Sequence, residues 1–171
     1  MTLTARDVMT PDVTTVHQDT PATDLIEMFR ESHFTGIPVV DDAGKAVGLV
    51  SESDILRALA YAASPPNDSR PKVSSKSKGT SAYLLEEVPE DRQIGGVIGD
   101  LLRRKARELM SPVVVSCRPE ESLAAVCETM AWKEVHRVIV TEADGRVVGL
   151  IAALGLVQHY GEHLRHLEKG K

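Results

Sequence analysis

The motif SESD at residues 51–54 combines a hydroxyl and a carboxylate where an apolar run gives way to a helix-like pattern. Ser51 can cap the N-terminus of that helix, and the backbone amides of a helix N-terminus can bind a phosphate. Asp54, one turn later, can accept two hydrogen bonds from the vicinal diol of a ribose. The same Ser-x-x-Asp spacing is an ordinary capping arrangement, so spacing alone leaves both interpretations open.

A second pair of polar side chains, His136 and Arg137, directly precedes the apolar run VIV. The planar guanidinium of Arg137 donates hydrogen bonds in pairs, which suits a phosphate. A solvated His-Arg pair at the start of a strand is the alternative interpretation. The basic run at 103–107 is expected to be a solvated helix face that could also add contacts to a phosphate or an acidic partner.

Other reactive side chains do not form recognisable sets. Cys117 and Cys127 have no His or Cys neighbours at metal-ligand spacing, so we predict no metal site and no redox role. The sequence contains no P-loop, Ser-His-Asp arrangement or paired catalytic carboxylates at recognisable spacing. We therefore expect a protein that is not an enzyme.

These residues belong to a sequence that repeats itself at an offset of 101 residues. ARDVMTPDV (5–13) aligns with ARELMSPVV (106–114), and DDAGKAVGLV (41–50) aligns with EADGRVVGLI (142–151). Over residues 5–56 the alignment has no gap and 11 identities in 52 positions, where chance gives about 3. The chain therefore contains two copies of one unit.

Each copy predicts the same order of elements. A short helical lead-in (4–9 and 105–110) ends near a proline, and a brief β-prone run follows. Next come an amphipathic helix and a hairpin whose turn combines acidic residues with glycine. A last helix (53–63 and 153–167) closes the copy. Such a β-α-β-β-α unit of about 55 residues buries too little surface to be stable alone.

We therefore predict an α/β (α+β) module in which two pseudo-symmetric β-α-β-β-α repeats pack through their sheets. The first repeat covers residues 1–63, and residues 64–93 form a flexible insert rich in Ser and Pro. Residues 94–171 provide a lead-in helix, expected over 94–110, and the second repeat.

Bulk composition excludes several classes of protein. The 171 residues include 20 Lys+Arg and 25 Asp+Glu, a formal charge of −5, which argues against nonspecific nucleic-acid binding. No apolar run approaches the roughly 18–20 residues that span a bilayer, and no secretory signal is visible. Two cysteines are too few for a disulfide framework, so we expect a soluble cytoplasmic protein.

In combination, the motifs resemble a tandem pair of cystathionine-β-synthase (CBS) domains, known as a Bateman module. MTP, the strand GIPVV, the acidic-Gly hairpin, VGLV and the Ser-x-x-Asp helix start occur in this order, and most recur in the second copy. The resemblance implies a non-catalytic regulatory module that binds AMP, ADP, ATP or S-adenosylmethionine in a cleft between its repeats and signals by changing conformation. It also implies a homodimer that regulates a protein the sequence does not name.

The resemblance further implies that Asp54 holds the ribose and that Ser51 lies near the phosphate. The aligned residues of the second copy, Ala152 and Gly155, have neither hydroxyl nor carboxylate. A ribose bound there would lack charge-assisted hydrogen bonds worth roughly 1.5–3 kcal/mol. We therefore predict unequal sites, with one competent cleft at Asp54 and one that is weak or empty.

His136 and Arg137 resemble a pair in the regulatory γ subunit of AMP-activated protein kinase that contacts phosphates. By position in the family, Val113, Val115 and Val135 would lie against the adenine of the Asp54 site, although all three could equally belong to the core. A ligand-free dimerisation or docking module, built on apolar helix faces, is the alternative function. This alternative function predicts that replacing Asp54 changes no property of the protein.

Overall fold

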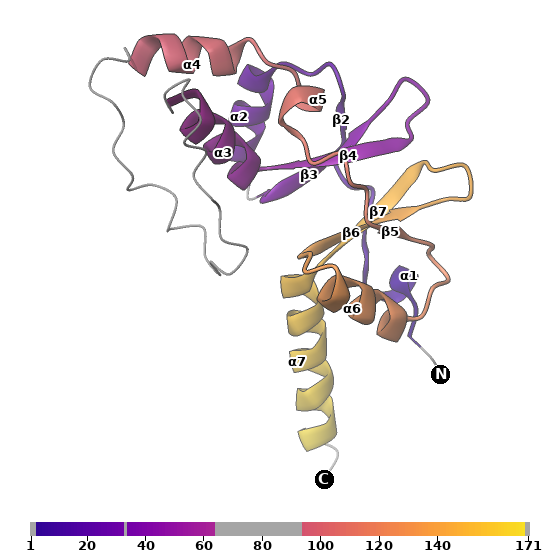
Figure 1. Cartoon of the computed structure of the whole chain (residues 1–171). Coiled ribbons are helices and arrows are strands. Elements are labelled where there is room, and N and C mark those ends of the chain that lie inside the picture. Colours follow the sequence, from indigo (N-terminus) through magenta and orange to yellow (C-terminus); the bar gives the residue numbers. More distant parts are fainter. Residues whose placement is uncertain (1–2, 33, 64–93, 170–171) are drawn as a thin grey trace.

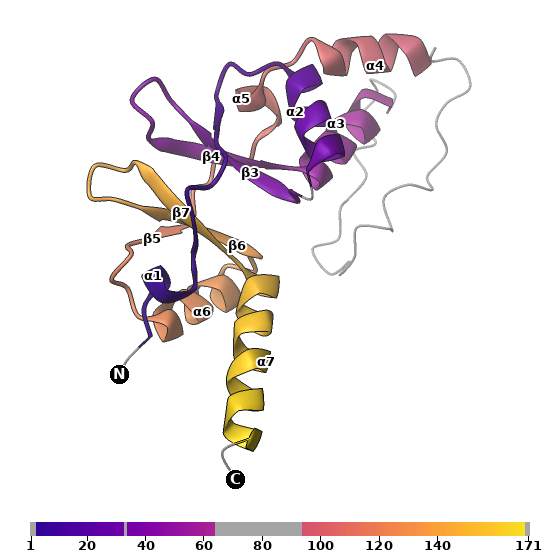
Figure 2. The same ribbon diagram turned by 180° about the vertical axis from the view of Figure 1, so that it is seen from behind.

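The structure is a computed structural model that describes residues 3–32, 34–63 and 94–169. The predicted insert, residues 64–93, lies outside them. The described chain forms two lobes whose β-hairpins lie side by side, and helices cover the outer face of each lobe (Figure 1). Seen from behind, the layers again run helix, sheet, sheet, helix (Figure 2). This arrangement agrees with the predicted fold class.

The chain before the insert provides the elements α1 (Ala5–Val8), β1 (Thr10–Pro11), β2 (Val16–His17), α2 (Ala22–Glu31), β3 (Gly36–Val40), β4 (Ala46–Ser51) and α3 (Glu52–Ala63). Strands β2, β3 and β4 form a three-stranded sheet. In this sheet β2 is parallel to β3, and β3 is antiparallel to β4.

The chain after the insert provides α4 (Ile94–Leu102), α5 (Ala106–Leu109), β5 (Ser116–Cys117), α6 (Leu123–Trp132), β6 (Arg137–Thr141), β7 (Val147–Ala152) and α7 (Ala153–Lys169). The second sheet has the order β1-β7-β6-β5, so a strand from the start of the chain forms one of its edges. No helix in the described ranges combines the length and the apolar character that crossing a membrane requires.

The two hairpins confirm the 101-residue offset at the level of single residues. Gly36 pairs with Ser51 in the first hairpin, and Arg137 pairs with Ala152 in the second. Both hairpins shift register at the equivalent step. The turn glycines Gly44 and Gly145 have φ values of 73° and 91°, a region that side chains disfavour, so the turns require glycine at this position.

The helix expected over residues 94–110 is divided in the structure into α4 and α5. The backbone between them bonds to the first repeat instead of continuing a helix. The Ala22 amide donates to the Arg104 carbonyl at 2.8 Å, and the Ala106 amide donates to the Thr20 carbonyl at 2.8 Å. These tertiary hydrogen bonds hold Lys105 in an extended conformation, which local helix propensity does not reveal.

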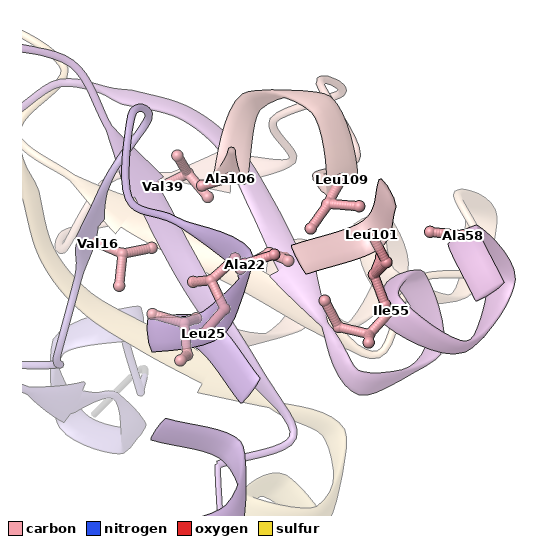
Figure 3. Close-up of a cluster of buried hydrophobic side chains, with 11 residues drawn as sticks. Val16, Ala22, Leu25, Val39, Ile55, Ala58, Leu101, Ala106 and Leu109 are labelled. Atoms are coloured by element: carbon pink, nitrogen blue, oxygen red, sulfur yellow. The ribbon is translucent and has the colours of Figure 1, made fainter. Parts of the chain in front are cut away.

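Each short lead-in helix packs on the other repeat. Leu101, Ala106 and Leu109 come from the chain after the insert, yet they are buried in the first core with Leu25 and Ile55 (Figure 3). Ala5, from the start of the chain, is fully buried in the second core, which includes Val126, Val138 and Ile151. The two repeats therefore exchange arms, which are the segment with α1 and the segment with α4 and α5. Each arm completes the core of the other repeat.

Equivalent polar contacts hold the two exchanged arms. The Ala5 amide donates to the Glu121 carbonyl at 2.8 Å, which mirrors the bond of Ala106. Arg6 pairs with Glu120 at 2.9 Å. Arg107 pairs with Asp19 at 2.7 Å. Because these partners are related by the 101-residue offset, one docking mode is used twice.

Candidate functional site

The Ser51–Asp54 motif lies where β4 ends and α3 begins. Ser51 is the last residue of β4, and α3 starts at Glu52. The Oδ2 atom of Asp54 accepts hydrogen bonds from the Ser51 amide at 2.9 Å and from the Ser51 hydroxyl at 2.6 Å. The motif therefore caps the helix, as one of the two interpretations of its spacing expects. A capping carboxylate can still accept further donors at its other oxygen.

The Asp54 carboxylate is almost buried, with 9% of its side chain exposed. Its Oδ1 atom accepts a hydrogen bond from the Nη1 of Arg57 at 2.8 Å, and the Arg57 side chain is 61% exposed. Arg57 is not among the site residues predicted from the sequence. Its position three residues after Asp54 on one helix was the available signal, since such residues are neighbours on a helix surface.

Arg137 reaches this region from the opposite repeat. It is the first residue of β6, and its Nη2 donates to the hydroxyl of Thr35. A Cβ at Gly36 would lie 3.1 Å from the Cζ of Arg137, so the guanidinium packs closely against the backbone at the start of β3. Burial lowers the pKa of Arg137, and the negative charges of Glu52 and Asp54 partly offset this effect. Because Gly36 pairs with Ser51 in the sheet, Arg137 lies beside the strand end from which α3 begins.

The remaining predicted residues are distributed differently. His136 is exposed, and its carbonyl accepts from the Ala153 amide at 2.9 Å where α7 begins. Val113 is 70% exposed, whereas Val115 is buried in the second core. Val135 is partly buried and packs against that same core. Val115 and Val135 thus occupy positions that fit the core interpretation, and Val113 is available at the surface.

The second repeat differs chemically at the equivalent turn. Ala152 ends β7, α7 begins at Ala153, and the first turn of α7 contains no acidic residue. A Cβ at Gly155 would meet no atom within 4 Å, so a side chain has room to begin at this position. On the partner side, Thr35 and Gly36 stand in place of His136 and Arg137.

A hollow of the surface lies elsewhere. A groove of about 720 Å³ runs between the ends of the two hairpins, where Gly44 of one turn faces Ala143 and Arg146 of the other. None of the predicted site residues lines it. Within the described part of the chain, no group of three or more His, Cys, Asp or Glu side chains could hold a metal ion.

Relatives of known sequence share most of this chain. An uncharacterized protein of Methanocaldococcus jannaschii, MJ1426, is 25% identical over 90% of this chain and 88% of its own length. The CBS domain-containing protein CBSX2 of Arabidopsis thaliana, a chloroplastic protein, is 30% identical over 91% of this chain and 62% of its own. The bovine 5′-AMP-activated protein kinase subunit gamma-3 is 23% identical over 86% of this chain. The chain spans less than two thirds of CBSX2 and 24% of the kinase subunit.

Solved structures share the fold. A crystal structure of CBSX2 in complex with AMP has a TM-score of 0.65 at 22% identity and covers 93% of this chain and 96% of its own. The CBS domain pair of MJ0100, in complex with 5′-methylthioadenosine and S-adenosylmethionine, has a TM-score of 0.68 at 17% identity. It covers 95% of this chain and 99% of its own. The family model of the CBS domain matches residues 5–61 and 106–160, which are the two copies of the repeat. The chain therefore belongs to the CBS domain family and carries two CBS domains in tandem.

Proposed function

We propose that this chain is a non-catalytic regulatory module that binds an adenosine-containing ligand beside Asp54 and signals by changing conformation. The observation that carries the proposal is that Arg137 of the second repeat packs against Gly36, whose strand partner Ser51 is hydrogen-bonded to Asp54 of the first repeat. Asp54 supplies a carboxylate that suits a ribose diol, and Arg137 supplies a guanidinium that suits a phosphate. A ligand that contacts both groups would bridge the two repeats.

The charges at this place favour a ligand that is anionic at one end. The Arg137 guanidinium is partly buried, and its hydrogen bond goes to a neutral hydroxyl, that of Thr35. Such a guanidinium can gain a charge-assisted pair of hydrogen bonds when a phosphate arrives. AMP, ADP and ATP all provide this group, and S-adenosylmethionine provides a carboxylate. The AMP complex of CBSX2 and the S-adenosylmethionine complex of MJ0100 support this range of ligands.

The direct test is calorimetric titration of ligand-free protein with AMP, ADP, ATP and S-adenosylmethionine. We expect at least one of them to bind, and Asp54→Asn to weaken that binding. One hydrogen bond to a charged acceptor is worth about 1.5–3 kcal/mol, so the loss of one such bond should lower the affinity roughly 10- to 100-fold. Absence of heat from all four ligands would overturn the proposal.

The chain offers a matched control for this variant. Asp7 caps α1 in the same way, because its Oδ2 accepts from the Thr4 amide and the Thr4 hydroxyl, both at 2.8 Å. Asp7→Asn therefore removes an equivalent cap without touching the proposed site. Nucleotide affinity should survive this change. An equal loss in both variants would mean that Asp54 acts through stability alone.

A docking module is the second candidate, and the outer face of α7 favours it. Leu154, Val157 and Tyr160 are 69%, 67% and 63% exposed and lie on one side of the helix, while Trp132 at the end of α6 is 92% exposed. We propose that this face pairs with a second copy, which gives a homodimer in either function. Light scattering at micromolar concentration tests the pairing, and Leu154→Glu should shift the protein to a monomer. If Asp54→Asn leaves every property unchanged, the docking function alone remains.

A further inference from the structure

The Asp54 carboxylate is already engaged by three donors. Its Oδ2 atom accepts two hydrogen bonds from Ser51, and its Oδ1 atom accepts one from Arg57. A carboxylate offers about four acceptor positions in all. With respect to the residues that the structure describes, one position on Oδ1 is therefore left for a new donor.

A ribose diol needs two positions. Its 2′- and 3′-hydroxyls donate one hydrogen bond each, and both must converge on the carboxylate. The two bonds from Ser51 belong to the cap of α3 and are short, at 2.9 Å and 2.6 Å. The bond from Arg57 comes from an exposed, flexible side chain, so it is the easiest one to displace.

We propose that Arg57 competes with the ribose for the Oδ1 atom of Asp54. This competition sets how much the 2′-hydroxyl adds to the affinity for the ligand. This inference rests on the proposed function. A ligand with a single ribose hydroxyl can use the open position and leave Arg57 in place. A ligand with both hydroxyls gains a second bond only by breaking the Asp54–Arg57 pair.

Removal of Arg57 leaves a competent acceptor. Asp54 keeps both hydrogen bonds from Ser51, and the positive charge of Arg137 remains close. Arg57→Met preserves the length of the side chain and the helix propensity of α3, so the variant loses the competing donor and little else.

The experiment compares AMP with 2′-deoxyadenosine 5′-monophosphate on wild-type protein and on Arg57→Met by calorimetry. We expect the variant to bind AMP about two- to five-fold more tightly, which is the range that an ion pair with one exposed partner supports. The affinity for the deoxy ligand should stay unchanged. The preference for AMP over the deoxy ligand should therefore grow in the variant.

Arg30→Met is the matched control, because Arg30 pairs with Glu27 across the same i,i+3 spacing on α2 and lies outside the site. It should change neither affinity. If Arg57→Met tightens the binding of both ligands equally, or weakens that of AMP, the competition is refuted while the nucleotide site stands. If neither protein binds either ligand, the competition is refuted, and the titrations with ADP, ATP and S-adenosylmethionine decide whether the proposed site stands.

Discussion

Substituting Gly48 tests the docking of the exchanged arms. Gly48 lies in β4, where α5 and the residues after it approach the sheet. A Cβ at this position would lie 2.7 Å from the Ser111 carbonyl oxygen and 2.9 Å from the Cγ of Met110. Comfortable contacts between such atoms begin at roughly 3.5 Å. The Ser111 backbone cannot yield easily, because it exchanges hydrogen bonds of 2.9 and 3.1 Å with Leu49.

Gly48→Ala should therefore destabilise the protein by about 1–3 kcal/mol, the usual cost of overpacking. Gly149, the equivalent residue of β7, provides a graded comparison. A Cβ there would lie 2.6 Å from the Sδ of Met9, the end of a flexible side chain, and 3.1 Å from the nearest backbone oxygen, that of Thr10. Because Met9 can move, Gly149→Ala should cost less than Gly48→Ala.

At Gly99 in α4, substitution by alanine should change the stability in the opposite direction. A Cβ there would meet no atom within 4 Å, so Gly99→Ala should stabilise the protein by up to about 1 kcal/mol through helix propensity alone. Urea unfolding followed by far-ultraviolet circular dichroism measures the free energy of unfolding of all three variants. In thermal unfolding, each kcal/mol should move Tm by about 2–4 °C. Equal stability of Gly48→Ala and Gly99→Ala would contradict the expected steric clash, and so would a larger loss of stability in Gly149→Ala than in Gly48→Ala.

Three further predictions follow from local contacts. Burial raises the pKa of the Cys117 thiol to about 11, so a thiol reagent should modify only the exposed Cys127 in native protein and both cysteines after unfolding. A hydrogen bond from Lys105 lowers the pKa of Asp19 below its ordinary value of 3.8. The stabilising effect of the ionised Asp19 should be complete above pH 3.8 and should be lost as the pH falls through the lowered pKa. The stability difference between wild type and Asp19→Asn, measured by urea unfolding, should therefore vanish in acid. The double variant Ala152→Ser, Gly155→Asp gives α7 the cap that α3 has, and Tm should rise with a stabilisation of about 0.5–2 kcal/mol; an unchanged Tm would contradict this.

The repeat made the central elements predictable. In both copies, two apolar runs flank a glycine-containing turn. This local pattern is enough to predict the hairpins β3–β4 and β6–β7. The closing helices were also predicted, and the structure begins α3 at Glu52 and α7 at Ala153. These elements are encoded by short-range periodicity and turn chemistry, which a single sequence displays.

The exchanged arms were not predictable in this way. Ala5 and Ala106 are small apolar residues in four-residue helices, and nothing local shows which core they enter. The division between α4 and α5 likewise depends on backbone bonds to Thr20 and Ala22, which are distant in sequence. At the candidate site, motif spacing predicted the cap at Ser51, but the occupation of Asp54 by Arg57 required side-chain geometry.

The exchange of arms also constrains how the protein is made. A ribosome releases residues in order, and the first core includes Leu101, Ala106 and Leu109, which are synthesised long after the strands they cover. Until these residues emerge, the first repeat has an uncovered apolar surface and cannot finish folding. The second core needs Ala5, which by then must still be accessible. Folding therefore ends as a late, joint event, and the contacts that complete it are among the most distant in sequence.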